Sequence, residues 1–262
     1  MTTATYLTLE YQHNHRIALV TLNRPDVRNA FNAQLIQELR SVFATLASNT
    51  DLHGVILTGA GTVFCAGADI HMMREAITYT TEQNVQDALQ LADMLSTLNA
   101  LPCPLIACVN GDAIGGGVGL VAVCDIVIAS EQARFAFSEV KLGIAPAVIS
   151  PYVIQKIGAN RARALFLTGE RFNAQQAYDY GLVHRISTPE QLNDTLQQIT
   201  TSLLQGGPQA LRACKALACT VEHMNPEEAR THTANVIAQL RVNTEGQEGL
   251  RAFLEKRSPV WM

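Results

Sequence analysis

The amino-acid sequence predicts an α/β fold that is followed by a helical segment. Short β-rich runs alternate with glycine-rich loops and with segments of helical periodicity over the first part of the chain. The run at residues 105–109 is continuously apolar, as expected of a strand that is buried on both faces of a parallel sheet. From about residue 159 the pattern becomes helical, so the 262 residues suit one large domain or one domain with a small appendage.

The first elements are a predicted hairpin and a predicted helix. Two β-rich runs, residues 6–11 and 17–22, flank the polar turn His13-Asn14-His15. Asn32 is a candidate N-cap for the helix that follows. The apolar residues behind Asn32 fall at helical spacing: Leu35, Ile36, Leu39, Val42, Phe43 and Leu46. The same criteria then predict a strand, a helix, the buried strand, a short helix opened by a glycine triplet, and another strand: residues 55–58, 83–99, 105–109, 115–117 and 126–129.

The later part of the chain carries three helix start signals, at Asn173, at residues 188–191 and at Asn225. Two of them combine a Pro at the first helical position with a Gln or Glu three residues after the cap. Gly206-Gly207-Pro208 separates two of the helices and is a candidate hinge. We therefore expect an α/β core over residues 1–195 and an all-helical segment over residues 196–262, whose stripe of Val236, Ile237 and Leu240 lacks an obvious partner within the chain and favours oligomerisation.

Composition and charge exclude several classes of function. The 19 Lys and Arg against 23 Asp and Glu give a net charge of −4, and no run of like charge suggests a nucleic-acid surface. The most apolar stretch stops at Asp125, short of the roughly 20 residues that span a membrane. Six cysteines without a C-x-x-C pair, and a start without a secretory leader, predict a reducing, cytoplasmic location. Charged residues make up only 16%, which favours an oligomer.

Metal, hydrolase and dinucleotide sites find little support. The seven histidines form no H-E-x-x-H motif and no Cys/His spacing suited to zinc, so we expect no metal and no cofactor. A G-x-S-x-G nucleophile elbow is absent. Residues 117–122 match G-x-G-x-x-A, but Asn110 to Ile114 intervene after the preceding strand and a whole α/β segment comes before. A purely structural glycine turn is the other interpretation of this stretch.

The functional interpretation combines two segments of small residues. In Cys65-Ala66-Gly67-Ala68-Asp69 and in Gly115-Gly116-Gly117, the small side chains let a ligand approach the backbone and leave N–H groups free at a helix start. Two such donors that meet at one point form an oxyanion hole. Glu139 is the charge inside an otherwise apolar run and is the candidate general base. The alternative is that Glu139 is an ordinary surface or salt-bridged residue.

Several motifs together resemble the enoyl-CoA hydratase/isomerase (crotonase) family, in order and over nearly the whole chain. No single motif is specific, but the set is. It consists of Leu22-Asn23-Arg24-Pro25 with Arg28-Asn29-Ala30, then Phe64-Cys65-Ala66-Gly67-Ala68-Asp69-Ile70, Asn110-Gly111 with Gly115-Gly116-Gly117, Cys124-Asp125, residues 135–143, and Ala252-Phe253-Leu254-Glu255-Lys256-Arg257.

The resemblance implies a spiral of ββα units, a helical segment that forms a homotrimer or homohexamer, and an acyl-CoA thioester as the ligand, without a bound metal. The oxyanion donors would be the N–H groups of Ala68 and Gly116, and Glu139 would be the catalytic carboxylate. Asp69 would mainly hold its loop in shape. By position, the residues that contact CoA would be Arg28, Ala30, Ala66, Asp69 and Ile70, and, from a neighbouring subunit, Phe253 and Lys256.

One departure from the family concerns the chemistry. Hydratases with two glutamates carry the first of them two residues after the glycine triplet, where this sequence has Gly119. Glu139 could then direct the water and return its proton alone, or with help from another group such as part of the substrate. A single carboxylate also suits a double-bond isomerase. Gly119 suggests, as a third alternative, a CoA-binding protein without catalysis.

The segment after Glu139 favours hydration. It lacks the glycine-rich sequence that many two-glutamate hydratases place after Pro146, and it most resembles the branch that acts on branched or carboxylated enoyl-CoA compounds, such as 3-methylglutaconyl-CoA. A substrate carboxylate would require a cation. Lys141 and Arg134 are the candidates, although Lys141 is more readily interpreted as a solvated residue.

Overall fold

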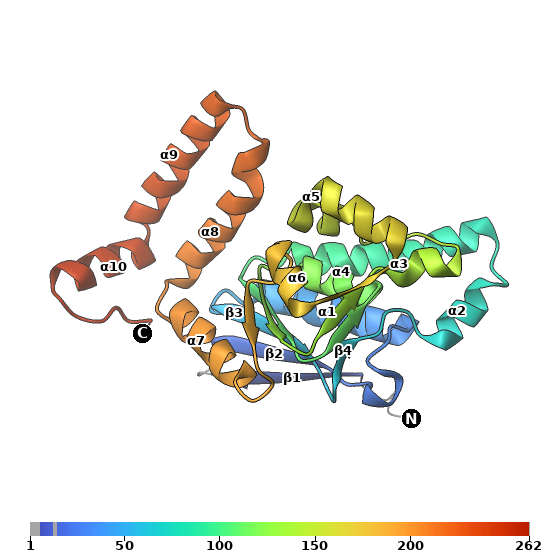
Figure 1. Ribbon diagram of the computed structural model, residues 1–262. Helices are drawn as coiled ribbons and strands as arrows, with labels where there is room; N and C mark the ends of the chain where they lie inside the picture. Colours follow the sequence, from blue (N-terminus) through green and yellow to red (C-terminus); the bar gives the residue numbers. More distant parts are fainter. Residues whose placement is uncertain (1–5, 13–14, 262) are drawn as a thin grey trace.

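Two β-sheets organise the body of the protein (Figure 1). The computed structural model describes residues 6–12 and 15–261. The larger sheet has the order β1-β2-β3-β5-β7-β10; β1 pairs with β2 in antiparallel fashion and the other pairs are parallel. Its strands are β1 (Leu7–Gln12), β2 (Ile17–Leu22), β3 (Gly54–Gly59), β5 (Leu105–Val109), β7 (Ile126–Ser130) and β10 (Arg185–Ser187).

The smaller sheet repeats the connectivity of the larger one. Its order is β4-β6-β8-β9, in which β4, β6 and β8 are parallel and β9 is antiparallel. These strands are β4 (Val63–Cys65), β6 (Asp112–Ile114), β8 (Arg134–Ala136) and β9 (Arg171–Asn173). The pairs β3–β4, β5–β6 and β7–β8 each give one strand to each sheet and are each followed by helix. The predicted spiral of ββα units is thereby confirmed.

The helices follow these strand pairs in order. After β4 come α2 (Ile70–Ala76) and α3 (Thr81–Asn99), and after β6 comes α4 (Gly116–Ala122). β8 is followed by a 3₁₀ helix, η2 (Ser138–Leu142), and by α5 (Ser150–Thr168). The remaining elements of the body are η1 (Pro25–Val27), α1 (Ala33–Ser48), α6 (Ala174–Asp179) and α7 (Leu192–Leu204).

Burial explains why these sequences form these elements. All five residues of β5 are buried, as predicted for a strand covered on both faces. In α1 the Asn32 side chain accepts a hydrogen bond from the N–H of Leu35, which confirms the predicted N-cap. One face of the large sheet packs in the main core with α1. The other face packs against Leu192 and Ile199 of α7 through four isoleucines, Ile17, Ile56, Ile106 and Ile128. The sheet is thus covered by helices on both faces.

Some helix boundaries differ from the prediction. Asn173 and Asn225 are N-caps with complete capping boxes, as expected. The start predicted at residues 188–191 is wrong, because α7 begins at Leu192 and Gln191 caps it without a side-chain bond. Helix also begins earlier than residue 159: α5 starts at Ser150 and is interrupted at Gly158, whose φ is 77°. The predicted hairpin is confirmed, although His13 and Asn14 of its turn lie outside the described residues.

Three C-terminal helices extend away from the body as an arm (Figure 1). They are α8 (Pro208–Thr220), α9 (Pro226–Val242) and α10 (Thr244–Leu254), and η3 (Val221–His223) joins the first two. Between residues 208 and 261 only Ala252 is buried. The division expected at residue 195 falls within α7, which packs on the sheet, so the arm itself begins after Gly206-Gly207. A division into domains stays a prediction.

Polar contacts tie the base of the arm to the body. Lys215 Nζ lies 2.7 Å from Asp125 Oδ2, and the same carboxylate accepts the N–H of Leu105 at 2.7 Å. Arg212 donates to the backbone oxygen of Asn49 at 2.6 Å. Within the described part of the chain, no helix combines the length and hydropathy that a membrane crossing requires.

Candidate active site

Three segments of the candidate site follow three neighbouring strands of the small sheet. β4 ends at Cys65, β6 at Ile114 and β8 at Ala136, and all three run parallel. Because the carboxyl ends of parallel strands share one edge of a sheet, the segments that follow them meet there. These segments contain Ala68, Gly116 and Glu139, which all line one cavity.

The backbone around Ala68 forms hydrogen bonds with the segment that contains Phe31. The N–H groups of Ala66 and Asp69 bond to the oxygens of Arg28 and Phe31, and the N–H of Phe31 bonds to Gly67. These bonds make Phe31 and Ala68 an isolated parallel β-bridge. No acceptor among the described residues takes the N–H of Ala68. This donor is therefore available to a ligand in the cavity.

The second donor is the N–H of Gly116, the first residue of α4, which has no acceptor among the described residues either. Gly115 precedes it with φ 54° and ψ −120°, a conformation that favours glycine. A Cβ at Gly67 would lie only 3.7 Å from the nitrogen of Gly116, so the two loops are in close contact. Ala68 and Gly116 line the same cavity, each with a backbone N–H that has no acceptor among the described residues.

Glu139 is the acid–base candidate of the cavity. Its Oε2 is buried and has no hydrogen-bond partner, and its Oε1 lies so close to Gly115 that a Cβ there would approach it to 2.8 Å. Burial raises the pKa of Glu139 above the ordinary glutamate value, although its own backbone N–H opposes this. The ionised carboxylate is poorly solvated, so it is a stronger base than an exposed glutamate.

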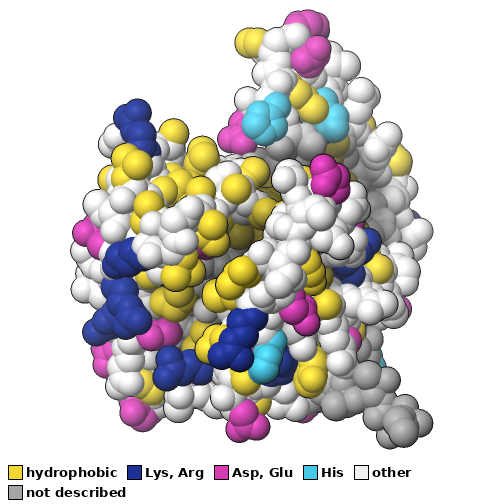
Figure 2. All heavy atoms as spheres, turned by 90° about the vertical axis from the view of Figure 1, so that its right-hand side faces the viewer, with side chains coloured by type: hydrophobic (Ala, Val, Ile, Leu, Met, Phe, Trp, Pro, Cys, Tyr) yellow, Lys and Arg dark blue, Asp and Glu magenta, His cyan; other side chains and the backbone are white. Residues whose placement is uncertain are grey.

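The cavity around Glu139 is apolar and has a volume of about 330 Å³. Figure 2 shows apolar side chains gathered around a hollow on the face that carries α2 and α3. Apart from Ser138 and Glu139, the described residues that line it carry no polar side chain. Its aliphatic walls include Leu91 of α3 and the loop between η2 and α5. Such a cavity fits a hydrocarbon group rather than a charged one.

A second cavity of about 690 Å³ adjoins the first and shares Ala66, Ala68 and Met73 with it. Arg28, His71 and Arg74 line it, and basic side chains lie near the hollow in Figure 2. Four of the predicted contact residues besides Arg28 also line this cavity, namely Ala30, Ala66, Asp69 and Ile70. The geometry suits a ligand whose acidic part lies here and whose apolar part enters the first cavity.

Asp69 holds the loop between the two cavities. Its Oδ1 accepts the N–H of His71 at the start of α2, and its Oδ2 forms a 2.8 Å ion pair with Arg24. Burial acts to raise the pKa of Asp69, but the bond from His71 and the Arg24 guanidinium outweigh it, so the pKa is lowered. This geometry is the one that the sequence interpretation expects of a residue that shapes its loop.

Phe253 and Lys256 do not join these residues within one chain. They lie at the end of α10, at the opposite end of the molecule from α2 (Figure 1). The N–H groups of Lys256 and Arg257 bond back to Phe253 and Ala252, which closes α10 with Lys256 at φ 54°. Phe253 is 83% exposed.

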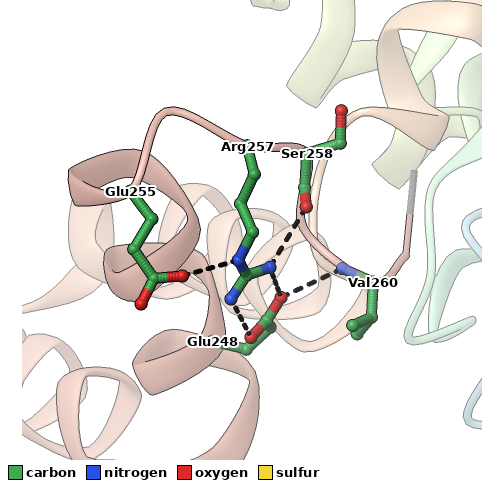
Figure 3. Close-up of polar contacts among 5 residues, drawn as sticks. All are labelled: Glu248, Glu255, Arg257, Ser258 and Val260. Atoms are coloured by element: carbon green, nitrogen blue, oxygen red, sulfur yellow. Dashed lines mark hydrogen bonds and ion pairs between the residues drawn. The ribbon is translucent and has the colours of Figure 1, made fainter.

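Arg257 fixes this turn at the end of α10 (Figure 3). Its guanidinium contacts both oxygens of Glu248, at 2.6 and 2.9 Å, and one oxygen of Glu255 at 2.7 Å. Glu248 also accepts the N–H of Val260. The turn that carries Phe253 and Lys256 is therefore held in a defined shape while both side chains remain uncovered in a single chain.

Sequence reasoning missed several residues of the two cavities. His71 and Arg74 follow Asp69 by two and five residues, and their placement on α2 could have identified them. Ile149 and Phe31 line the first cavity as ordinary apolar residues and gave no signal. Arg134 and Lys141 line neither cavity, and Arg134 bonds to backbone oxygens. Among the described residues, no cluster of three His, Cys, Asp or Glu could hold a metal.

Comparison with known proteins identifies the family of the chain. An enoyl-CoA hydratase of known structure from Shewanella pealeana is 40% identical with a TM-score of 0.93, covering 98% of this chain and 96% of its own. Mevalonyl-coenzyme A hydratase of Aspergillus fumigatus is 36% identical over 94% of this chain and 91% of its own length. 2,3-Dehydroadipyl-CoA hydratase of Escherichia coli is 33% identical over 93% and 94%. The pattern of the Enoyl-CoA hydratase/isomerase family matches residues 12–262, and the chain belongs to that family.

Proposed function

We propose that this protein adds water across the 2,3-double bond of an acyl-CoA thioester, with the N–H groups of Ala68 and Gly116 as the oxyanion hole. The observation that carries the proposal is the convergence of these two unpaired donors and the Glu139 carboxylate on one apolar cavity. The relatives named as hydratases support hydration as the reaction.

The proposed mechanism uses one carboxylate for both proton transfers. Water attacks C3 while Glu139 takes one of its protons, and the thioester oxygen becomes enolate-like and accepts hydrogen bonds from Ala68 and Gly116. Glu139 then returns the proton to C2, which forms the 3-hydroxyacyl-CoA. The two donors stabilise charge that develops only along the reaction, which is the condition for rate acceleration.

The second cavity, which is lined by Arg28 and Arg74 and also by the carboxylates Asp26 and Asp69, is the proposed site for the CoA part. Arg28 and Arg74 offer guanidinium groups that pair with phosphate oxygens, and His71 lies beside them. Ala30, Ala66 and Ile70 would contact the CoA moiety through backbone and small or apolar surfaces. CoA is then part of the substrate, and the proposed reaction requires no further cofactor.

The acyl group is proposed to be branched. The relatives' names give two different acyl groups, 2,3-dehydroadipyl and mevalonyl, and do not select one for this chain. 3-Methylglutaconyl-CoA is the carboxylated candidate. Its distal carboxylate would require a cation, and no described residue that lines the cavity around Glu139 supplies one. Uncharged branched enoyl groups fit the cavity without that requirement.

A homotrimer or homohexamer is the proposed assembly. The arm leaves apolar side chains uncovered, and the stripe of Val236, Ile237 and Leu240 on α9 has no buried member. An assembly that covers this stripe could also bring Phe253 and Lys256 to the CoA site of a neighbour. The six free cysteines, two of them exposed on α8, support a reducing compartment such as the cytoplasm.

A panel of CoA esters tests the proposed function. We expect loss of enoyl absorbance with crotonyl-CoA or 3-methylcrotonyl-CoA, with a 3-hydroxyacyl-CoA product, and 3-methylglutaconyl-CoA tests whether a carboxylated ester is also accepted. Conversion of 3-enoyl-CoA alone would establish the isomerase instead, which the single carboxylate also allows. If no ester reacts while all bind, the protein is a CoA-binding module and the proposed reaction is refuted.

A further inference from the structure

Gly119 of α4 lies directly against Ile149, the residue that precedes α5. A Cβ on Gly119 would overlap the Cγ2 atom of Ile149 and would lie 3.0 Å from its Cβ and 3.8 Å from Cδ1 of Leu95. Any side chain at residue 119 therefore competes with Ile149 for the same space. Two features that look independent in the sequence, a glycine at residue 119 and a bulky residue at 149, are one contact in the structure.

Ile149 cannot easily move away from Gly119. It is 2% exposed, and its backbone oxygen accepts the N–H of Val153 in the first turn of α5. The loop before it is tied down as well: the N–H of Ala147 bonds to Ala145, and both the N–H and the hydroxyl of Ser150 bond to the oxygen of Ala147. The backbone that carries Ile149 is therefore held in place, and the side chain is enclosed by its surroundings.

Ile149 also forms part of the wall of the cavity that contains Glu139. We propose that Gly119 and Ile149 are a coupled pair, in which the glycine admits the Ile149 side chain and that side chain limits the acyl group that binds beside Glu139. This inference rests on the proposed function. Because the wall is aliphatic, it admits an apolar acyl surface, and because Ile149 is fixed, it restricts the size of that surface.

Selectivity is the first test of the pair. Removing three carbon atoms with Ile149→Ala should raise kcat/KM for bulky enoyl-CoA esters relative to crotonyl-CoA by about 10-fold or more, and Ile149→Phe should lower that ratio. The ratio is independent of the fraction of folded enzyme. Ile154→Ala is the matched control, because Ile154 is on α5, the helix that Ile149 precedes, is 41% exposed and lines neither cavity. A ratio that stays within twofold of wild type in both Ile149 variants would overturn the proposal.

Coupling is the second test and uses thermal unfolding. Gly→Ala normally stabilises a helix, yet Gly119→Ala should lower Tm by at least about 4 °C because its Cβ meets Ile149. In an Ile149→Ala background the same change should cost clearly less, since the Cγ2 atom is gone. Equal effects in both backgrounds would refute the coupling. If wild-type protein hydrates no ester, the proposed function fails, whereas this cycle still tests the pair.

Discussion

The body and the arm of this protein differ in how their apolar residues are covered. In the body, the strands and helices bury a continuous core that includes Phe43, Phe64 and Phe135. In the arm, the same kinds of residues remain uncovered, and Val242, Leu250 and Leu254 are each at least half exposed. The two regions have clear secondary structure, so helix formation alone does not distinguish them.

This difference concerns how each region is stabilised. The body buries its apolar side chains within one chain, whereas helices that expose apolar faces gain most of their stability from packing against another surface. In the proposed assembly, a neighbouring subunit would cover the exposed apolar side chains of the arm. Ala68, Gly116 and Glu139 of the candidate site all lie in the body. Substitutions confined to the body or to the arm therefore test the two regions separately.

The largest effect is expected from Glu139→Gln in the body. The amide keeps the shape of the side chain but cannot accept a proton, so turnover should fall by about 10² to 10⁴. The affinity for CoA esters and the mass of the oligomer in solution should not change. Steady-state rates and binding titrations measure this, with Glu170→Gln on the exposed surface as the control. Retention of more than about half of the turnover would mean that another group is the base.

A change on the arm should dissociate the assembly without unfolding the body. The double substitution Ile237→Glu and Leu240→Glu places two charges on the apolar stripe of α9. Burial of these unpaired charges in a subunit interface is unfavourable. Light scattering should then give the 28.4 kDa single chain in place of an oligomer. Gln239→Glu, an exposed neighbour, is the control. A wild-type protein that is itself a stable 28.4 kDa monomer would contradict the proposed assembly.

Lys256→Gly should separate binding from chemistry. Glycine tolerates the φ of 54° at this position, so the turn is kept while the ammonium group is lost. If Lys256 contacts CoA across an interface, KM should rise by about 10-fold, equivalent to about 1.4 kcal/mol. We expect kcat to be unchanged. An unaltered KM in an intact oligomer would remove Lys256 from the CoA site.

The smallest effect concerns the cost of keeping Glu139 ionised. Burial raises its pKa, so between the ordinary and the raised value the folded state binds more protons than the unfolded state. The protonated Glu139 side chain therefore costs the folded state less than the ionised one, and the folded state loses stability as the pH rises through the raised pKa. Glu139→Gln should raise Tm at neutral pH by about 2–4 °C for each kcal/mol regained. Tm measured against pH checks this, and no difference at high pH would contradict it.

The same pKa sets the acid limb of activity. Glu139 must be ionised to take a proton from water, so kcat/KM should fall as the pH drops through the raised pKa, above the ordinary glutamate range. The pH dependence of activity and of stability would then report one group with opposite signs.

Local sequence signals determined many of the individual elements. The apolar run of β5, the Asn32 cap of α1 and the capping boxes at Asn173 and Asn225 all act within a few residues, so periodicity and side-chain chemistry predicted them. The family motifs also identified Ala68, Gly116 and Glu139 as candidates. The start predicted at residues 188–191 failed because the local signal there forms a turn and not a helix.

The tertiary structure decided what these residues do together. β4, β6 and β8 have three residues each, too short for any periodicity, yet their parallel order places Ala68, Gly116 and Glu139 around one cavity. The burial of Glu139 and the contact between Gly119 and Ile149 likewise arise between segments distant in sequence. The sequence by itself therefore determined the residue types and the local elements, because those depend on near neighbours. Proximity, burial and shared space depend on packing, and only the fold decided them.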